Sequence, residues 1–149
     1  GFEGVDKRID VLATALRAGM TVFDLQELEL AYAPPFSSAK DPVNLAGYTA
    51  GNIVNKHIIP VYWQEVPELL NQGAYLLDVR TPKEFAAGAA DGAHNIPVDD
   101  LRNRLTEIPR DRDILVYCRT GLRSYIACRL LTQHGYQVKN INGGYKLYK

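Results

Sequence analysis

The apolar and polar positions of this chain follow two patterns, which divide near residues 51–56. Beyond the division, short apolar runs alternate with segments of helical spacing. The expected strands are 58–62, 75–79, 94–97, 114–117 and 138–142. The expected helices are 65–71, 82–88, 100–105 and 122–134. Strands separated by helices predict an α/β fold, with an open, mainly parallel five-stranded sheet and helices on both faces.

Several of these elements carry local signals of their own. Pro60 has no amide hydrogen to donate, which places its strand at a sheet edge. Residues 75–79 form a continuous apolar run, as expected of a strand buried on both faces. Residues 81–84 form a capping box with proline at the first helical position, a strong signal for a helix start. Ligands of such sheets bind beyond the carboxyl ends of the strands.

Residues 1–52 show helical spacing instead. Asp6 is the expected cap of a first helix, and Gly19 is its expected end. One side of that helix carries Val5, Ile9, Leu12, Ala13 and Leu16. A second helix start at 21–24 leads into Leu25, Leu28 and Leu30, and an irregular loop follows at 34–42. We expect a helical hairpin, so that an N-terminal helical appendage (1–52) precedes an α/β domain (53–149).

Composition narrows the functional classes. The 149 residues are 46% hydrophobic, which suffices for a core, and 17 basic residues balance 17 acidic ones. This balance predicts no nucleic-acid or membrane partner, and neither a membrane span nor a signal peptide is visible. The two cysteines, Cys118 and Cys128, indicate neither a disulfide framework nor a metal site, which fits a cytoplasmic protein. A chain that begins with Gly1 is expected to be a processed or excised piece of a longer one.

The segment 118–124 carries the strongest chemical signal. Cys118 follows an apolar run and precedes a helix, so backbone N–H groups and the helix dipole converge on its sulfur. Arg119 and Arg123 are expected to lower the pKa of the Cys118 thiol and to attract an anionic donor. We predict Cys118 as the nucleophile. The predicted substrate-binding residues are Arg119, Thr120, Gly121, Leu122, Arg123 and Ser124.

Two of these residues have narrower expected roles. Gly121 supplies backbone freedom within the loop. Ser124 either donates a hydrogen bond to the site or caps the helix, and the sequence favours neither. The alternative for Cys118 itself is a buried, inert cysteine in front of a helix, which the flanking arginines, glycine and serine disfavour.

The spacing within the loop indicates which anion it binds. Four residues separate Cys118 from Arg123, whereas phosphatases that form a cysteinyl phosphate have five. The shorter loop suits a single sulfur atom, and here the chain resembles the rhodanese-type sulfurtransferases. The matching segments are 77–80, 84–85, 95–97, 114–124 and 142–145. One departure falls at 88–93, where the family often has Gly-His-Ile-x-Gly-Ala. His94 follows it, with either a pocket-rim or a structural role.

This resemblance implies a rhodanese-like fold and sulfur transfer through a Cys118 persulfide. The donor would be thiosulfate or a low-molecular-weight persulfide, such as coenzyme A persulfide. The acceptor would be a thiol or cyanide.

A second resemblance lies in the N-terminal part. Residues 32–42 are similar to the end of the dimerisation domain of coenzyme A disulfide reductases, in the pyridine nucleotide-disulfide oxidoreductase superfamily. It implies a parent enzyme that uses FAD and NADH, a homodimer formed through residues 1–52, and a contribution of Tyr32 and Tyr48 to a coenzyme A site. No Gly-x-Gly-x-x-Gly follows a strand, so neither cofactor is expected to bind within this chain.

Three other functions remain open at this stage. In the first, the domain is a catalytically silent rhodanese module for partner binding or dimerisation. In the second, the domain is a phosphatase or arsenate reductase that uses the Cys118 thiolate. In the third, residues 1–52 are the functional half, as a dimerisation and coenzyme A-binding piece.

Overall fold

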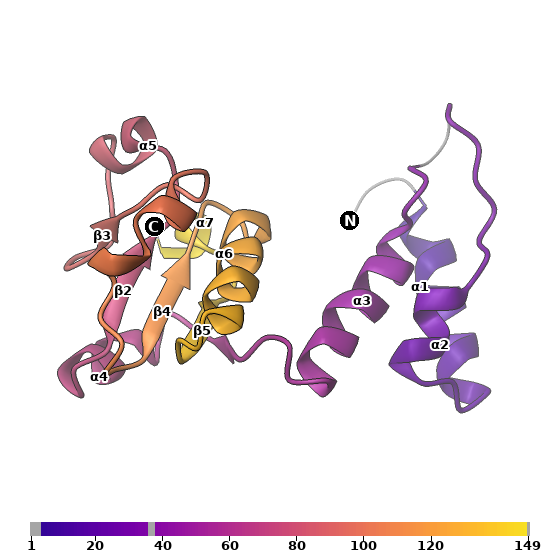
Figure 1. The fold of residues 1–149 in the computed structure, drawn as a ribbon. Helices are drawn as coiled ribbons and strands as arrows, with labels where there is room; N and C mark the ends of the chain where they lie inside the picture. Colours follow the sequence, from indigo (N-terminus) through magenta and orange to yellow (C-terminus); the bar gives the residue numbers. More distant parts are fainter. Residues whose placement is uncertain (1–3, 36–37, 149) are drawn as a thin grey trace. The chain divides into compact units, whose positions relative to one another are not determined.

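The computed structural model describes residues 4–35 and 38–148. The chain divides into two compact units that meet between Lys56 and His57. The first unit is helical, and the second is an α/β domain (Figure 1). Within the described residues, no helix is both long and apolar enough to cross a bilayer.

The α/β unit is built on a five-stranded sheet in which every neighbouring pair is parallel. The strands, in spatial order, are β1 (Pro60–Val61), β5 (Val138–Ile141), β4 (Ile114–Tyr117), β2 (Tyr75–Asp78) and β3 (His94–Asn95). The predicted open sheet is confirmed, and it is parallel throughout. The strand that contains Pro60 lies at one edge, where a residue without an amide hydrogen is tolerated.

Side chains of the central strand β4 alternate between two hydrophobic cores. Its first and third residues pack in the core that contains Leu131 of α6 (Leu122–Gln133). Its second and fourth residues pack in the core that contains Val66 of α4 (Val66–Asn71). Helix α6 lies along β4 and β5 (Figure 1). Both faces of the sheet are covered, which explains why β4 reads as an uninterrupted apolar run.

The prediction of a regular helix at 100–105 is wrong. Two short 3₁₀ helices, η1 (Leu101–Asn103) and η2 (Leu105–Glu107), occupy this region. Their bonds span three residues, as in the 3.0 Å contact from the Asn103 amide to the Asp100 carbonyl. Asp and Asn side chains compete for backbone hydrogen bonds and so disfavour a regular α-helix, while the buried Leu101 anchors the turn.

The helical unit contains three helices among its described residues, not the expected hairpin. They are α1 (Val5–Arg17), α2 (Val22–Glu27) and α3 (Pro42–Val54). The cap of α1 is Gly4 in a left-handed conformation, and Asp6 lies in the first turn, where its charge suits the helix dipole. Helix α2 has the predicted capping box but ends at Glu27, so Leu28 and Leu30 lie beyond it.

Helix α3 is the element that the sequence analysis missed. Its start is marked by Asp41, whose carboxylate accepts a 2.9 Å hydrogen bond from the Val43 amide, and by proline in its first turn. Gly47 lets α3 approach α2 closely, because a Cβ atom there would lie 2.9 Å from the Val22 carbonyl oxygen. The helix continues past residue 52 to Val54, and the two compact units meet two residues later.

The C-terminal turn supports the loop that follows β4. The amide of Tyr145, in the short helix α7 (Tyr145–Tyr148), donates a 2.8 Å hydrogen bond to the Cys118 carbonyl. The indole nitrogen of Trp63 donates to the Gly144 carbonyl at 2.8 Å. Gly144 has a φ of +56°, and a Cβ atom there would lie 2.5 Å from the Cys118 carbonyl oxygen. Only glycine fits this contact without a shift of backbone.

We therefore expect G144A to destabilise the α/β unit more than G135A does. Both positions have a positive φ, which costs an alanine about 1 kcal/mol, but nothing lies within 4 Å of a Cβ atom at Gly135. The backbone clash at Gly144 adds about 1–3 kcal/mol. Urea unfolding followed by the fluorescence of Trp63, the single tryptophan, measures both variants. Equal unfolding midpoints would contradict the close contact.

Candidate active site

The sulfur of Cys118 lies in the turn between β4 and α6. Cys118 directly follows β4, and α6 begins four residues later at Leu122, after Gly121 with a φ of +141°. The amide of Gly121 donates a 3.1 Å hydrogen bond to the Cys118 Sγ. Cys118 is only 1% exposed, so a donor reaches the sulfur only after neighbouring groups move. The side chain faces backbone amides, which is the arrangement that an anionic sulfur needs.

Opposing effects act on the pKa of the Cys118 thiol. Burial raises this pKa, whereas hydrogen bonds from the Ser124 hydroxyl and from the amides of Ser124, Gly121 and Thr120 lower it. The hydrogen bonds outweigh burial, so the pKa lies below its ordinary value of 9.0. The Ser124 hydroxyl also lies 2.9 Å from the Gly121 carbonyl oxygen, so rotation of one hydrogen directs it to either acceptor.

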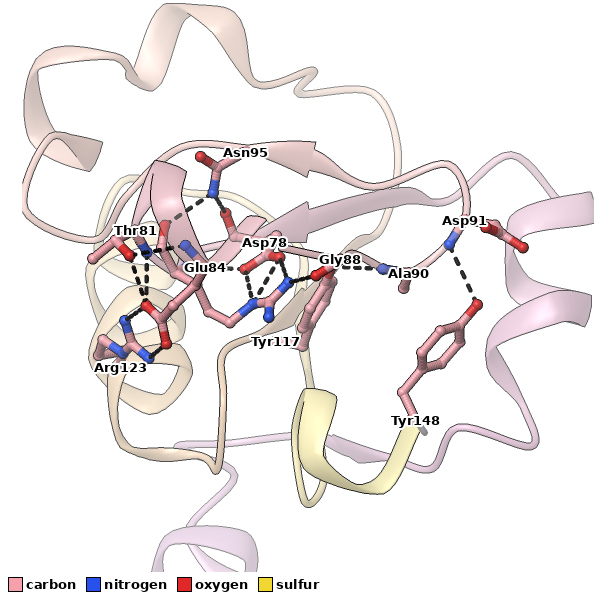
Figure 2. Close-up of polar contacts among 11 residues, drawn as sticks. Asp78, Thr81, Glu84, Gly88, Ala90, Asp91, Asn95, Tyr117, Arg123 and Tyr148 are labelled. Carbon is pink, nitrogen blue, oxygen red and sulfur yellow. Dashed lines mark hydrogen bonds and ion pairs between the residues drawn. The ribbon is translucent and has the colours of Figure 1, made fainter. Parts of the chain in front are cut away.

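Arg123 is fixed by a carboxylate. Its two terminal nitrogens lie 2.7 and 2.8 Å from the two oxygens of Glu84, in α5 (Pro82–Ala86). Figure 2 shows this bidentate pair beside Thr81, whose amide and hydroxyl also donate to Glu84 at 3.0 and 2.9 Å. These bonds, led by that of Arg123, lower the pKa of Glu84 from 4.5 to about 2. The capping box predicted from sequence thus also ties α5 to the start of α6.

Arg123 still acts on the site through its charge. The pKa of Arg123 is raised first by its hydrogen bonds to Glu84 and, to a smaller extent, by the negative charge of Cys118. The same attraction favours the Cys118 thiolate. The guanidinium is therefore a fixed cation near the sulfur, and its hydrogen-bonding capacity is largely taken by Glu84.

A second ion pair is buried at the end of β2. Arg80 lies 2.6 Å from a carboxylate oxygen of Asp78, and neither side chain is more than 4% exposed. Arg80 also donates to the Gly88 carbonyl at 2.9 Å, and its guanidinium lies 4.0 Å from the ring centroid of Tyr145. The Arg80 guanidinium also lies 5.5 Å from the ring centroid of Tyr117. Because each charge is compensated, this pair shapes the site without adding net charge.

A cleft of about 370 Å³ lies next to the loop. Its walls come from the segment after β2, α5 and the residues that follow it, the loop after β4 and the C-terminal turn. They are formed by Arg80, Glu84, Ala87, Gly88, Arg119, Tyr145 and Lys146. Of the predicted binding residues, only Arg119 lines this cleft, whereas Thr120, Gly121 and Ser124 supply amides to the sulfur and Leu122 is 71% exposed. Sequence reasoning missed Tyr145 and Lys146, although the Gly143-Gly144 pair before them marks a close backbone approach.

The segment that departs from the family pattern is held by tyrosines. The Ala90 amide donates to the Tyr117 hydroxyl at 3.2 Å, and the Asp91 amide donates to the Tyr148 hydroxyl at 3.4 Å (Figure 2). His94 stacks on Tyr75, with ring centroids 4.4 Å apart, and it does not line the cleft. These contacts favour a structural role for His94.

Other candidate residues lie away from the sulfur. Cys128 is buried in α6, and burial raises the pKa of its thiol, so it remains protonated. No group of three or more His, Cys, Asp or Glu side chains in the described ranges could hold a metal ion. Tyr32 and Tyr48 belong to the helical unit, where both are exposed and the Tyr48 hydroxyl donates to the Gln26 carbonyl at 3.3 Å. Their contribution to a coenzyme A site stays a prediction.

Comparison with known proteins identifies the family. The model of the rhodanese-like domain matches residues 63–149, which is more than half of the chain. The chain therefore belongs to the family of rhodanese-like domains. Among curated proteins, a sulfurtransferase of Allochromatium vinosum is 49% identical over 70 residues, which are 46% of this chain and 65% of that protein. A coenzyme A disulfide reductase of Staphylococcus aureus is 58% identical over 50 residues, which are 34% of this chain and 11% of the reductase.

Two solved structures match nearly the whole chain. Reduced CoADR-RHD of Bacillus anthracis has a TM-score of 0.92 and 54% identity, over 98% of this chain and 26% of that one. The NAD-dependent persulfide reductase from A. fulgidus has a TM-score of 0.83 and 41% identity, over 100% of this chain and 27% of that one. The present chain thus spans about a quarter of these relatives. The resemblance to rhodanese domains and to coenzyme A disulfide or persulfide reductases is confirmed.

The Glu84–Arg123 pair makes the stability of the protein depend on pH. The carboxylate form of Glu84 binds Arg123, so its contribution is complete above the ordinary pKa of 4.5 and is lost as the pH falls toward about 2. We expect E84Q to lower the melting temperature at neutral pH and to approach the wild type in acid. Thermal unfolding monitored through Trp63 measures this difference. E68Q, which removes a carboxylate bonded to Gln72 at 3.2 Å, is the control. A pH-independent gap between E84Q and wild type would contradict the argument.

Removal of the Ser124 hydroxyl is expected to raise the pKa of Cys118, because one of the hydrogen bonds that lower it is lost. The ultraviolet absorbance of the thiolate, followed against pH, reports this pKa without interference from Cys128, whose thiol stays protonated. T120A is the matched control, since Thr120 contributes its amide, which the substitution keeps. If S124A titrates like the wild type, the hydroxyl does not stabilise the thiolate.

Proposed function

We propose that this chain is a sulfurtransferase domain that moves sulfane sulfur through a persulfide on Cys118. The donor is thiosulfate or a low-molecular-weight persulfide, and the acceptor is a thiol or cyanide. One observation carries the proposal: the Cys118 Sγ accepts a 3.1 Å hydrogen bond from the Gly121 amide in a loop that lowers the pKa of the thiol. Membership of the rhodanese-like family supports the same reaction class.

The reaction proceeds in two displacement steps. The Cys118 thiolate attacks the outer sulfur of the donor, a new S–S bond forms, and the donor's S–S bond breaks with its electron pair on the leaving group. The added sulfur is anionic, and the amides that now face Sγ are the nearest groups able to hold it. An acceptor thiolate or cyanide then takes that sulfur and releases the Cys118 thiolate. The lowered pKa of the Cys118 thiol increases the fraction of thiolate, and a thiolate attacks without a general base.

The alternatives fit the site less well. A phosphatase or arsenate reductase must surround a tetrahedral phosphate or arsenate group with loop amides, but this loop has one residue fewer between Cys118 and Arg123. A silent module has no need of a lowered thiol pKa, which weakens the case for that alternative. Nor does a silent module explain why a hydroxyl and several amides are directed at one sulfur atom.

For the longer protein, we propose an FAD- and NADH-dependent reductase of coenzyme A disulfide or persulfide. Similarity to the chains of the two solved structures supports this proposal, as does the name of the curated reductase. The Gly143-Gly144 pair does not fit a dinucleotide: the site of a Cβ atom at Gly144 is filled by the Cys118 loop, and its carbonyl binds Trp63. In this proposal, FAD and NADH bind to other parts of the reductase. Residues 1–52 form the dimer, and their Tyr32 and Tyr48 contact coenzyme A.

Incubation with thiosulfate is expected to add the mass of one sulfur atom to the intact protein, and subsequent cyanide to remove it as thiocyanate. Mass spectrometry of the intact chain measures both steps. C118S should gain nothing, whereas C128S, in which a buried packing thiol is changed, should still gain one sulfur. A wild-type protein that gains no sulfur from thiosulfate or from a small persulfide would favour the silent module.

A further inference from the structure

Two cations of the cleft beside the Cys118 loop have no charged partner in the described part of the chain. Four charged side chains line this cleft, namely Arg80, Glu84, Arg119 and Lys146. Arg80 is compensated by Asp78 at 2.6 Å, and Glu84 is compensated by Arg123 at 2.7 Å. Arg119 and Lys146 remain, and both residues are exposed. The cleft therefore presents two uncompensated positive charges to solvent.

The backbone holds these two residues side by side. The Lys146 amide donates a 3.1 Å hydrogen bond to the Arg119 carbonyl, next to the 2.8 Å bond from Tyr145 to Cys118. Gly144 packs closely against the backbone of Arg119, since a Cβ atom at residue 144 would lie 2.8 Å from the Arg119 carbonyl carbon and oxygen. The C-terminal turn thus fixes the base of Lys146 relative to the loop. Two like charges at one cleft repel, and an anion between them relieves that repulsion.

We propose that Arg119 and Lys146 together bind the oxyanion end of the sulfur donor, and that Lys146 makes the site selective for donors whose leaving group is a divalent oxyanion. The inference rests on the proposed sulfur transfer and names the group that recognises the donor. Arg123 was expected to share this task with Arg119, but it is held by Glu84. Lys146, from a separate part of the chain, supplies the second cation instead.

Thiosulfate has the matching chemistry. Its outer sulfur bonds to the Cys118 Sγ, its S–S bond breaks, and the electron pair leaves with sulfite, so one thiolate and one dianion give one persulfide anion and one dianion. The divalent charge moves toward the oxygens as sulfite departs. Cations at the cleft next to the loop stabilise that charge, while the transferred sulfur stays among the amides.

The test compares two donors in the full chain. K146Q should lower kcat/KM about tenfold for thiosulfate, and it should leave the rate nearly unchanged with 2-mercaptoethanol persulfide, whose leaving group is a thiolate and not a divalent oxyanion. K146R should retain the preference for thiosulfate. K139Q is the matched control, because Lys139 pairs with Asp113 at 2.7 Å and does not line the cleft. Added salt should weaken thiosulfate turnover more in the wild type than in K146Q.

The outcomes separate this inference from the proposed function. If the wild type accepts sulfur from neither donor, sulfur transfer itself is refuted. If the wild type is active and K146Q equals it with thiosulfate, Lys146 plays no part in donor binding. Equal losses with both donors would make Lys146 a support of the loop and would overturn its role as an anion ligand. Because Lys146 is exposed, K146Q should keep the wild-type Trp63 emission, which verifies the fold.

Discussion

The hydrogen bond from the Gly121 amide to the Cys118 sulfur sets the requirements for the rest of the domain. An amide can stabilise an anion only if the backbone that carries it is held in place, and every side of this loop is held. The buried strand β4 fixes its start and α6 fixes its end. Gly144 and the amides that follow it close the third side. The surrounding fold thus keeps the Gly121 amide in place beside the Cys118 sulfur.

Charge compensation decides which groups can act on a substrate. The side chains of Asp78 and Arg80 neutralise each other inside the protein, and Glu84 occupies the guanidinium of Arg123. The Glu84–Arg123 pair joins α5 to α6, whereas Asp78 and Arg80 lie two residues apart at the carboxyl end of β2. Two of the four charged residues that line the cleft are thus neutralised by their partners, so an incoming anion meets only Arg119 and Lys146 as uncompensated charges of the lining.

Sequence alone predicted the sheet, its edge strand and the strand-to-helix turn that carries Cys118, because these depend on local patterns such as apolar runs and a proline. It did not predict that Arg123 pairs with Glu84, since 39 residues separate them and only the fold brings them together. Lys146 escaped notice for the same reason. Helix α3 was missed although Asp41 and Pro42 marked its start, because its glycines lowered the apparent helical propensity.

The anion site around Cys118 is made largely of main-chain groups. Amides of Thr120, Gly121 and Ser124 face the sulfur, while the side chains of Thr120 and Leu122 are exposed. A binding surface of this kind is indifferent to the identity of the residues that display it. The outward faces of positions 120 and 122 are thus free to diversify toward different thiol carriers without altering the reactive centre beneath them.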